Sequence, residues 1–268
     1  MILAADLGSR FIPVREPAIS ANPRPAAKAF RYERLREFAI VALLFVVFSA
    51  IYEFTRYLVG TDDLRLPLAN ARDIIALERQ LGLFFEPDLQ RATTGNAVLN
   101  QLSIWIYTYE HLTGAIVFYA AIWLFLPEKF PFIWRWFWVA HAVAILGFWL
   151  YPLAPPRLVP ELGMIDPTAA ALAAAPGAGA FSHIRNEFAA MPSLHIGYTL
   201  IYALVLWWVL PKTPLRWLVW LWPATILFVV MTTANHYWMD GAGAALCIGA
   251  SLAITLVLYG DLPRPWTR

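Results

Sequence analysis

Charge is scarce in this sequence of 268 residues: 14% of the residues are Asp, Glu, Lys or Arg, whereas 60% are hydrophobic. A soluble domain needs a more strongly charged surface, so this composition argues against the soluble classes of enzyme and binding protein. The net charge of +2 is too small to favour a nucleic-acid partner. The mean hydropathy of +0.58 indicates that lipid is the solvent of this chain.

Cysteine and lysine are both rare. Cys247 is the single cysteine and lies within an apolar run, which excludes an intramolecular disulfide and a cluster of thiolate metal ligands. Redox chemistry is therefore not expected. The chain has three Lys against 17 Arg, and with its many Ala this is typical of a GC-rich bacterial genome.

Long apolar runs are what the sequence has in abundance. Six stretches carry little or no charge over lengths near the ~20 residues that cross a bilayer. They lie at about 38–59, 103–126, 134–154, 192–210, 216–234 and 238–259. We predict an all-α fold, an integral membrane bundle of six transmembrane helices over residues 37–260. Residues 1–36 would form an N-terminal tail, disordered in part, and residues 261–268 a C-terminal tail.

The distribution of basic residues predicts the orientation of this bundle. The first 36 residues are too long and too rich in Arg and Pro for a secretory signal, so the first apolar run is an anchor. Thirteen of the 20 Lys and Arg residues fall in the two tails and in the short turns at 127–135 and 211–216. By the positive-inside rule both termini are cytoplasmic, and the loops at 60–102, 153–191 and 235–237 are extracytoplasmic. In a bacterium this would be the outer face of the plasma membrane.

Segment 70–85, within the first of these loops, has the pattern of an amphipathic helix. Its apolar stripe holds Ile74, Leu77, Leu81 and Phe84 or Phe85, and the opposite face holds Arg72, Asp73, Glu78 and Arg79. We expect a helix that lies in the outer membrane interface. The alternative is a folded extracytoplasmic loop.

The stretch NHYWMD at 235–240 places a histidine and an aspartate on the predicted outer face. His236 and Asp240 can touch if the sixth span starts near Asn235, because positions i and i+4 share one face of a helix. A carboxylate that accepts a hydrogen bond from one ring nitrogen leaves the other as a nucleophile or base. The alternatives are an interfacial histidine satisfied by a neighbouring acid and a metal site. Two ligands without a third are weak support for a metal, so none is predicted.

The stretch MPSLH at 191–195 brings a second histidine to the same face. Pro192 is suited to the first turn of the fourth span, whose free N–H groups, with Ser193, favour an anion. His195 lies one turn into this span. The alternative is an ordinary proline-started helix with a capping serine. Two histidines at the outer ends of spans favour a functional site, since ionisable groups there are costly.

An anionic substrate also needs fixed positive charge near these histidines. The loop between the third and fourth spans has two basic residues, Arg157 and Arg185, and the guanidinium of either could bind a phosphate through its planar fork. Arg157 is favoured because the prolines at 152, 155 and 156 stiffen its backbone. For Arg185 a solvated loop charge is the alternative.

Taken in order, three motifs resemble the phosphatidic acid phosphatase type 2 superfamily of membrane phosphatases and lipid phosphotransferases. They are APPRL with Arg157, PSLH at 192–195 and HYWMD at 236–240, and the resemblance covers most of the chain from about residue 38. It implies that His236 is the nucleophile for the phosphoryl group, Asp240 its orienting partner and His195 the acid that protonates the departing oxygen. Arg157 and Ser193 would hold the phosphate oxygens, without a metal or cofactor.

The chain departs from the commoner family pattern at four positions. A Lys, a Pro and a Ser-Arg pair of that pattern are replaced by Leu150, Leu158, Val229 and Val230. Arg185, Asn235 or Tyr237 are candidates to bind phosphate in place of the missing cations. The combination of PSLH with HYxxD is similar to the branch that includes inositol phosphorylceramide synthase, in which a lipid alcohol replaces water as the attacking group.

We therefore expect a membrane lipid phosphatase or lipid phosphotransferase that forms a phosphohistidine at the extracytoplasmic face. Its partners would be a lipid phosphate and, for transfer, a lipid alcohol. Glu110 and His111, near the outer end of the second span, are candidates to contact a head group. Two alternatives are a transporter or channel with an outer His/Asp gate and an inactive lipid-binding relative.

Overall fold

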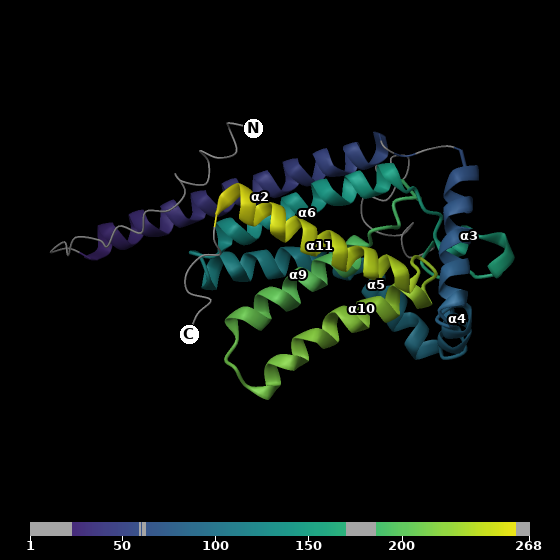
Figure 1. Cartoon of the computed structure of the whole chain (residues 1–268). Coiled ribbons are helices and arrows are strands. Elements are labelled where there is room, and N and C mark those ends of the chain that lie inside the picture. The colour runs from purple at the N-terminus through teal and green to yellow at the C-terminus, as the bar shows by residue number, and fades with distance from the viewer. Residues whose placement is uncertain (1–22, 59, 61–62, 170–185, 261–268) are drawn as a thin grey trace. The chain divides into compact units, whose positions relative to one another are not determined.

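The computed structural model describes residues 23–58, 60, 63–169 and 186–260, with side chains from residue 36 onward. Residues 1–54 and 55–268 form two compact units, and each is described by itself. Over the described residues the secondary structure is helical and contains no strand (Figure 1). The prediction of an all-α fold is confirmed.

The described part of the first unit is helical. It consists of residues 23–54 of helix α2 (Pro23–Leu58), which starts well before the expected span at residue 38. The second unit contains α3 (Arg65–Gln80), α4 (Glu86–Thr94), α5 (Ala97–Phe125), α6 (Phe130–Leu150), η1 (Pro156–Leu158), η2 (Pro160–Leu162), α9 (Leu194–Val209), η4 (Pro214–Trp220), α10 (Leu221–Thr232) and α11 (Trp238–Tyr259). Helix α11 packs on α6 and α9, and α10 packs on α5 and α9.

Four helices in the described part of the chain are long and apolar enough to cross a membrane. They are Arg36–Leu58, Phe130–Leu150, Pro214–Thr232 and Trp238–Tyr259. Helix α9 has 16 residues and would be ~24 Å long, short of a ~30 Å hydrocarbon core. Helix α5 has 29 residues but includes Asn100, Gln101, Glu110 and His111. The count of six spans therefore stays a prediction, with α5 and α9 as the two uncertain members.

A helix forms within the segment 70–85, but one residue of its expected polar face is buried. Helix α3 ends at Gln80, and Glu78, expected on the polar face, is fully buried. Leu77 and Leu81 of the expected apolar stripe are 39% and 53% exposed, so the location of this stripe in the membrane interface stays a prediction. Glu78 itself is buried for a local reason. The reason is a polar contact, because the Glu78 carboxyl accepts a hydrogen bond from the Met239 backbone N–H at the start of α11. Satisfying the first turn of a buried helix thus determines which way α3 faces.

A hydrophobic cluster fixes α3 against the loop that follows α6. Ala71 and Ile75 of α3 pack with Leu153, Val159 and Tyr237, all of them buried. Two polar contacts reinforce the packing: the Asn70 side chain donates to the carbonyl of residue 152 at 2.8 Å, and the Ala154 N–H donates to the carbonyl of residue 67 at 3.1 Å. This cluster holds together the chain segments that carry Arg157 and His236.

Candidate active site

His236 lies in a short link between α10 and α11. The link reverses direction through Ala234, whose φ of +55° is in the left-handed region, and through Val230, whose carbonyl accepts from the N–H groups of Asn235 and His236. Because α11 begins at Trp238, His236 is not on the helix, contrary to the expected i,i+4 pair on one helix. Its Nδ1 nevertheless lies 2.9 Å from Asp240 Oδ2.

Asp240 is the third residue of α11 and is fully buried. Its Oδ2 atom also accepts a hydrogen bond from the Tyr237 N–H at 3.1 Å, which fixes the carboxylate on the helix start. With Nδ1 directed at an acceptor, the proton of the neutral imidazole belongs on Nδ1. The lone pair is then on Nε2, which could act as a nucleophile or base.

The Nε2 atom of His236 faces the second motif. Ser193 Oγ lies 3.3 Å from it, and the rings of His195 and His236 are 5.8 Å apart between centroids. Helix α9 starts at Leu194, so Pro192 precedes the helix, and its expected place in the first turn is wrong. Ser193 is the N-cap residue but makes no side-chain cap, which leaves its hydroxyl directed at the imidazole.

Two glycines leave space for the segment that carries Ser193. A methyl group on Gly147 of α6 would lie 2.6 Å from Pro192 Cδ, and one on Gly243 of α11 would lie 3.0 Å from Met191 Cγ. Real Cβ atoms essentially never come closer than 3.0 Å to such a neighbour. The absence of side chains at these two positions lets the segment pass between the two helices.

Arg157 is joined to the His236 link by both backbone and side chain. Its N–H donates to the Ala234 carbonyl at 3.0 Å, and its Nη1 donates to Asn235 Oδ1 at 2.8 Å. Asp166 pairs with Nε at 3.1 Å, and the Arg157 side chain is 9% exposed. These contacts hold the guanidinium in one orientation beside the histidine link. Asn235 serves here as a partner of Arg157.

The electrostatic surroundings keep His236 neutral. Burial lowers the pKa of His236 to about 3, and the positive charges of Arg157 and Arg56 act in the same direction. Arg56, near the end of α2, donates from Nη2 to the Asn186 carbonyl at 3.0 Å, and the Asn186 amide donates back to the Arg56 carbonyl. Arg56 lies outside the three motifs, but its position as a cation near the end of an apolar run is visible in the sequence.

Aromatic side chains surround His195 on the side of α5. Tyr107 stacks on the His195 ring with 4.7 Å between centroids, and the His111 ring lies 4.4 Å from it. His111 also stacks on Tyr198 at 4.3 Å. The structure therefore brings the head-group candidate His111 to the histidine cluster. Tyr107, which lies outside the three motifs, is a further member of this aromatic cluster.

The other predicted site residues lie elsewhere or outside the described residues. Glu110 is buried and accepts a hydrogen bond from Trp222 Nε1 of α10 at 3.1 Å. The Tyr237 hydroxyl donates to the Ala154 carbonyl at 3.2 Å, and burial raises the pKa of this phenol, so it stays protonated. Arg185 falls in the part of the chain that is not described.

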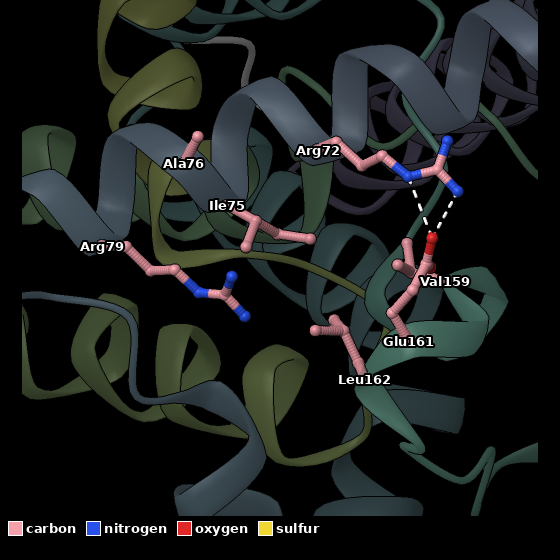
Figure 2. A pocket seen from close by; sticks show the side chains of 7 residues that line it. All are labelled: Arg72, Ile75, Ala76, Arg79, Val159, Glu161 and Leu162. Atoms are coloured by element: carbon pink, nitrogen blue, oxygen red, sulfur yellow. Dashed lines mark hydrogen bonds and ion pairs between the residues drawn. The ribbon is translucent and has the colours of Figure 1, made fainter.

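Two hollows lie apart from the histidine pair. One, of about 240 Å³, lies between α3 and η2; Figure 2 shows Arg72 of α3 paired with Glu161 there and Arg79 reaching in from the same helix. The other, of about 490 Å³, is lined by apolar residues of α5, α9 and the η4–α10 segment. The second has the lining and the surroundings that suit a hydrocarbon chain.

Comparison with protein families settles the family of the chain. The family model of the PAP2 superfamily matches residues 72–254, a range that contains all three motifs. The chain belongs to the PAP2 superfamily. This confirms the resemblance at the level of the superfamily and, with the four apolar helices, indicates an integral membrane phosphatase or phosphotransferase of lipid phosphates. No curated protein and no solved structure matches the chain. Among the described residues of this PAP2 protein, no cluster of three or more His, Cys, Asp or Glu could hold a metal.

Proposed function

We propose that this PAP2 protein transfers a phosphoryl or phosphoalcohol group from a membrane lipid through a phosphohistidine on His236, at the extracytoplasmic face. The observation that carries the proposal is the contact of 2.9 Å between His236 Nδ1 and Asp240 Oδ2, with Nε2 facing Ser193 and His195. A neutral imidazole with its lone pair on the free nitrogen is ready to attack phosphorus.

The phosphate would be held by groups around this nitrogen. Ser193 offers a hydroxyl, and the first turn of α9 offers the N–H groups and dipole that favour an anion. Arg157 offers a guanidinium whose orientation Asn235 and Asp166 fix. Arg56 is our candidate for a second cation, in place of the Lys and Arg of the commoner family pattern.

The reaction would proceed in two displacements. In the first, His236 Nε2 bonds to phosphorus, the bond from phosphorus to the lipid oxygen breaks, and His195 gives its proton to that oxygen. In the second, water or a lipid alcohol attacks phosphorus, His195 takes the proton of the attacking hydroxyl, and the bond from phosphorus to nitrogen breaks. Asp240 holds the imidazole throughout and stabilises the positive charge that it develops.

An assay of the purified protein against mixed lipids would test this proposal. The lipids would include phosphatidic acid, a polyprenyl diphosphate and phosphatidylinositol, with and without a lipid alcohol, and mass spectrometry would score hydrolysis against transfer. Vanadate, which mimics the trigonal phosphoryl group, should inhibit without added metal. Ion or solute flux into sealed vesicles without phosphate release would contradict the proposal and favour the transporter.

Arg157→Lys is expected to lower kcat/KM by about 100-fold, because the lysine loses the planar fork that binds two phosphate oxygens. Release of phosphate by the purified variant measures this effect. Arg91→Lys on α4, where the guanidinium is exposed and paired with Asp88, is the matched control. Equal kcat/KM in the two variants would contradict a role for Arg157 in phosphate binding.

The apolar hollow between α5, α9 and η4–α10 is our candidate for the hydrocarbon chain of the substrate. Ala121→Trp should fill it and raise KM for a long-chain lipid phosphate by about 10-fold, while KM for a short-chain analogue changes little. Ile116→Trp, on the exposed side of the same helix, is the control. If Ala121→Trp changed KM equally for the long-chain and the short-chain lipid phosphate, the hydrocarbon chain of the substrate would not lie in this hollow.

A further inference from the structure

Two buried glutamates meet the first turn of α11 from outside that helix. Glu78 of α3 and Glu86 of α4 both have no exposed surface. Glu86 Oε1 accepts from the Trp238 N–H at 3.0 Å, and Glu78 Oε1 accepts from the Met239 N–H at 3.2 Å. Figure 1 shows α3 and α4 lying across the end of the bundle where α11 begins.

All four N–H groups at this helix start are satisfied within the chain. Glu86 and Glu78 take those of Trp238 and Met239, Asp240 Oδ2 takes that of Tyr237, and the Tyr237 carbonyl takes that of Asp240. The same first turn therefore holds both the two glutamates and the carboxylate that orients His236. A shift of this turn would move Asp240 directly.

The two glutamates cannot both carry a charge at this depth. Burial, and next the negative charge of Glu86, raise the pKa of Glu78 to about 9. The titratable groups that face Glu78 are Glu86 from α4, Asp240 from α11 and Tyr237 from the link. The neighbouring Arg79 turns away, with its guanidinium over the Phe84 ring. At neutral pH Glu78 thus keeps its proton.

We propose that Glu78 and Glu86 are positioning residues of the phosphohistidine site: two carboxyl groups that cap α11, with Glu78 protonated, and so set the geometry of Asp240 and His236. This inference rests on the proposed function. Neither glutamate touches the substrate. A single negative charge suits the positive end of the helix dipole, whereas a second charge would drive the pair apart.

The pH dependence of kcat separates this role from a merely structural one. The wild-type protein should lose activity above about pH 9, as Glu78 loses its proton. Glu78→Gln and Glu86→Gln should each keep kcat at pH 7 within about 3-fold and extend activity to higher pH by at least one unit. In either variant the pair can carry no more than one charge. Glu78→Ala, which leaves the Met239 N–H without its acceptor, should lower kcat about 100-fold with little change in KM.

Asp73→Asn on α3 and Asp88→Asn on α4 are matched controls, since both aspartates are exposed, and they should keep the wild-type pH profile. Gln variants whose alkaline limb coincides with that of the wild type would overturn the inference, even if Glu78→Ala fails to fold. His236→Gln distinguishes this result from failure of the proposed function. Phosphate release that persists in His236→Gln overturns the function, whereas an inactive His236→Gln beside unaltered Gln profiles overturns the positioning role alone.

Discussion

His236→Gln should abolish phosphate release from lipid substrates, with a loss of at least about 10⁴-fold in kcat. Glutamine has a similar reach and can still accept a hydrogen bond, but its amide nitrogen has no lone pair available to attack phosphorus. The wild-type protein, quenched during turnover with labelled lipid phosphate, should carry an acid-labile and alkali-stable label, as a phosphoramidate does. The variant should carry none.

The control for this experiment is a second buried histidine. His141 of α6 is hydrogen-bonded through Nδ1 to the Phe137 carbonyl and through Nε2 to the Tyr198 hydroxyl. His141→Gln should lower the melting temperature but retain turnover, because His141 takes no part in the proposed reaction. Both variants should insert into the membrane. Turnover of His236→Gln at the level of His141→Gln would rule out His236 as the nucleophile.

Gly147→Ala is expected to lower kcat/KM by about 100-fold without removing any group that takes part in the reaction. The added methyl would lie 2.6 Å from the Pro192 ring, so the segment before α9 must shift. Ser193 and His195 would move with it, and a displacement near 1 Å is enough to cost about two orders of magnitude in rate. Phosphate release and the melting temperature of the purified protein measure the two consequences.

Gly249→Ala is the matched control because a methyl group there would meet nothing within 4 Å. Alanine is the better helix former by about 1 kcal/mol, so this variant should be as stable as the wild type or more so. Its activity should be unchanged. Equal activity of the two glycine variants would show that the segment at 191–193 does not need the space that Gly147 provides.

The sequence predicted the parts of the site that depend on local chemistry. The helical fold followed from the apolar runs, and the three motifs identified the superfamily before any contact was known. The structure places Arg157, Ser193, His195, His236 and Asp240 in one connected cluster. Their catalytic roles remain our proposal.

What the sequence could not predict depends on contacts between distant segments. Glu78 has the charge of a surface residue, and only the position of α11 reveals why it is buried. Helix α9 begins two residues after Pro192, and the Ser193 hydroxyl points at His236, which the sequence alone does not reveal. Tyr107 and Arg56 lie outside the motifs, and only their positions near the ends of apolar runs suggested that they could line the site.

The close packing around His236 bears on the choice between hydrolysis and transfer. The His236 side chain is 8% exposed and Ser193 has no exposed surface, whereas His195 is only partly buried. A phosphorylated His236 would therefore meet few molecules of bulk solvent. The hydroxyl of a membrane lipid that approaches from the side of His195 would then compete better with water for the phosphorylated histidine than the low concentration of that lipid suggests. Loosening this packing should shift the product ratio toward free phosphate.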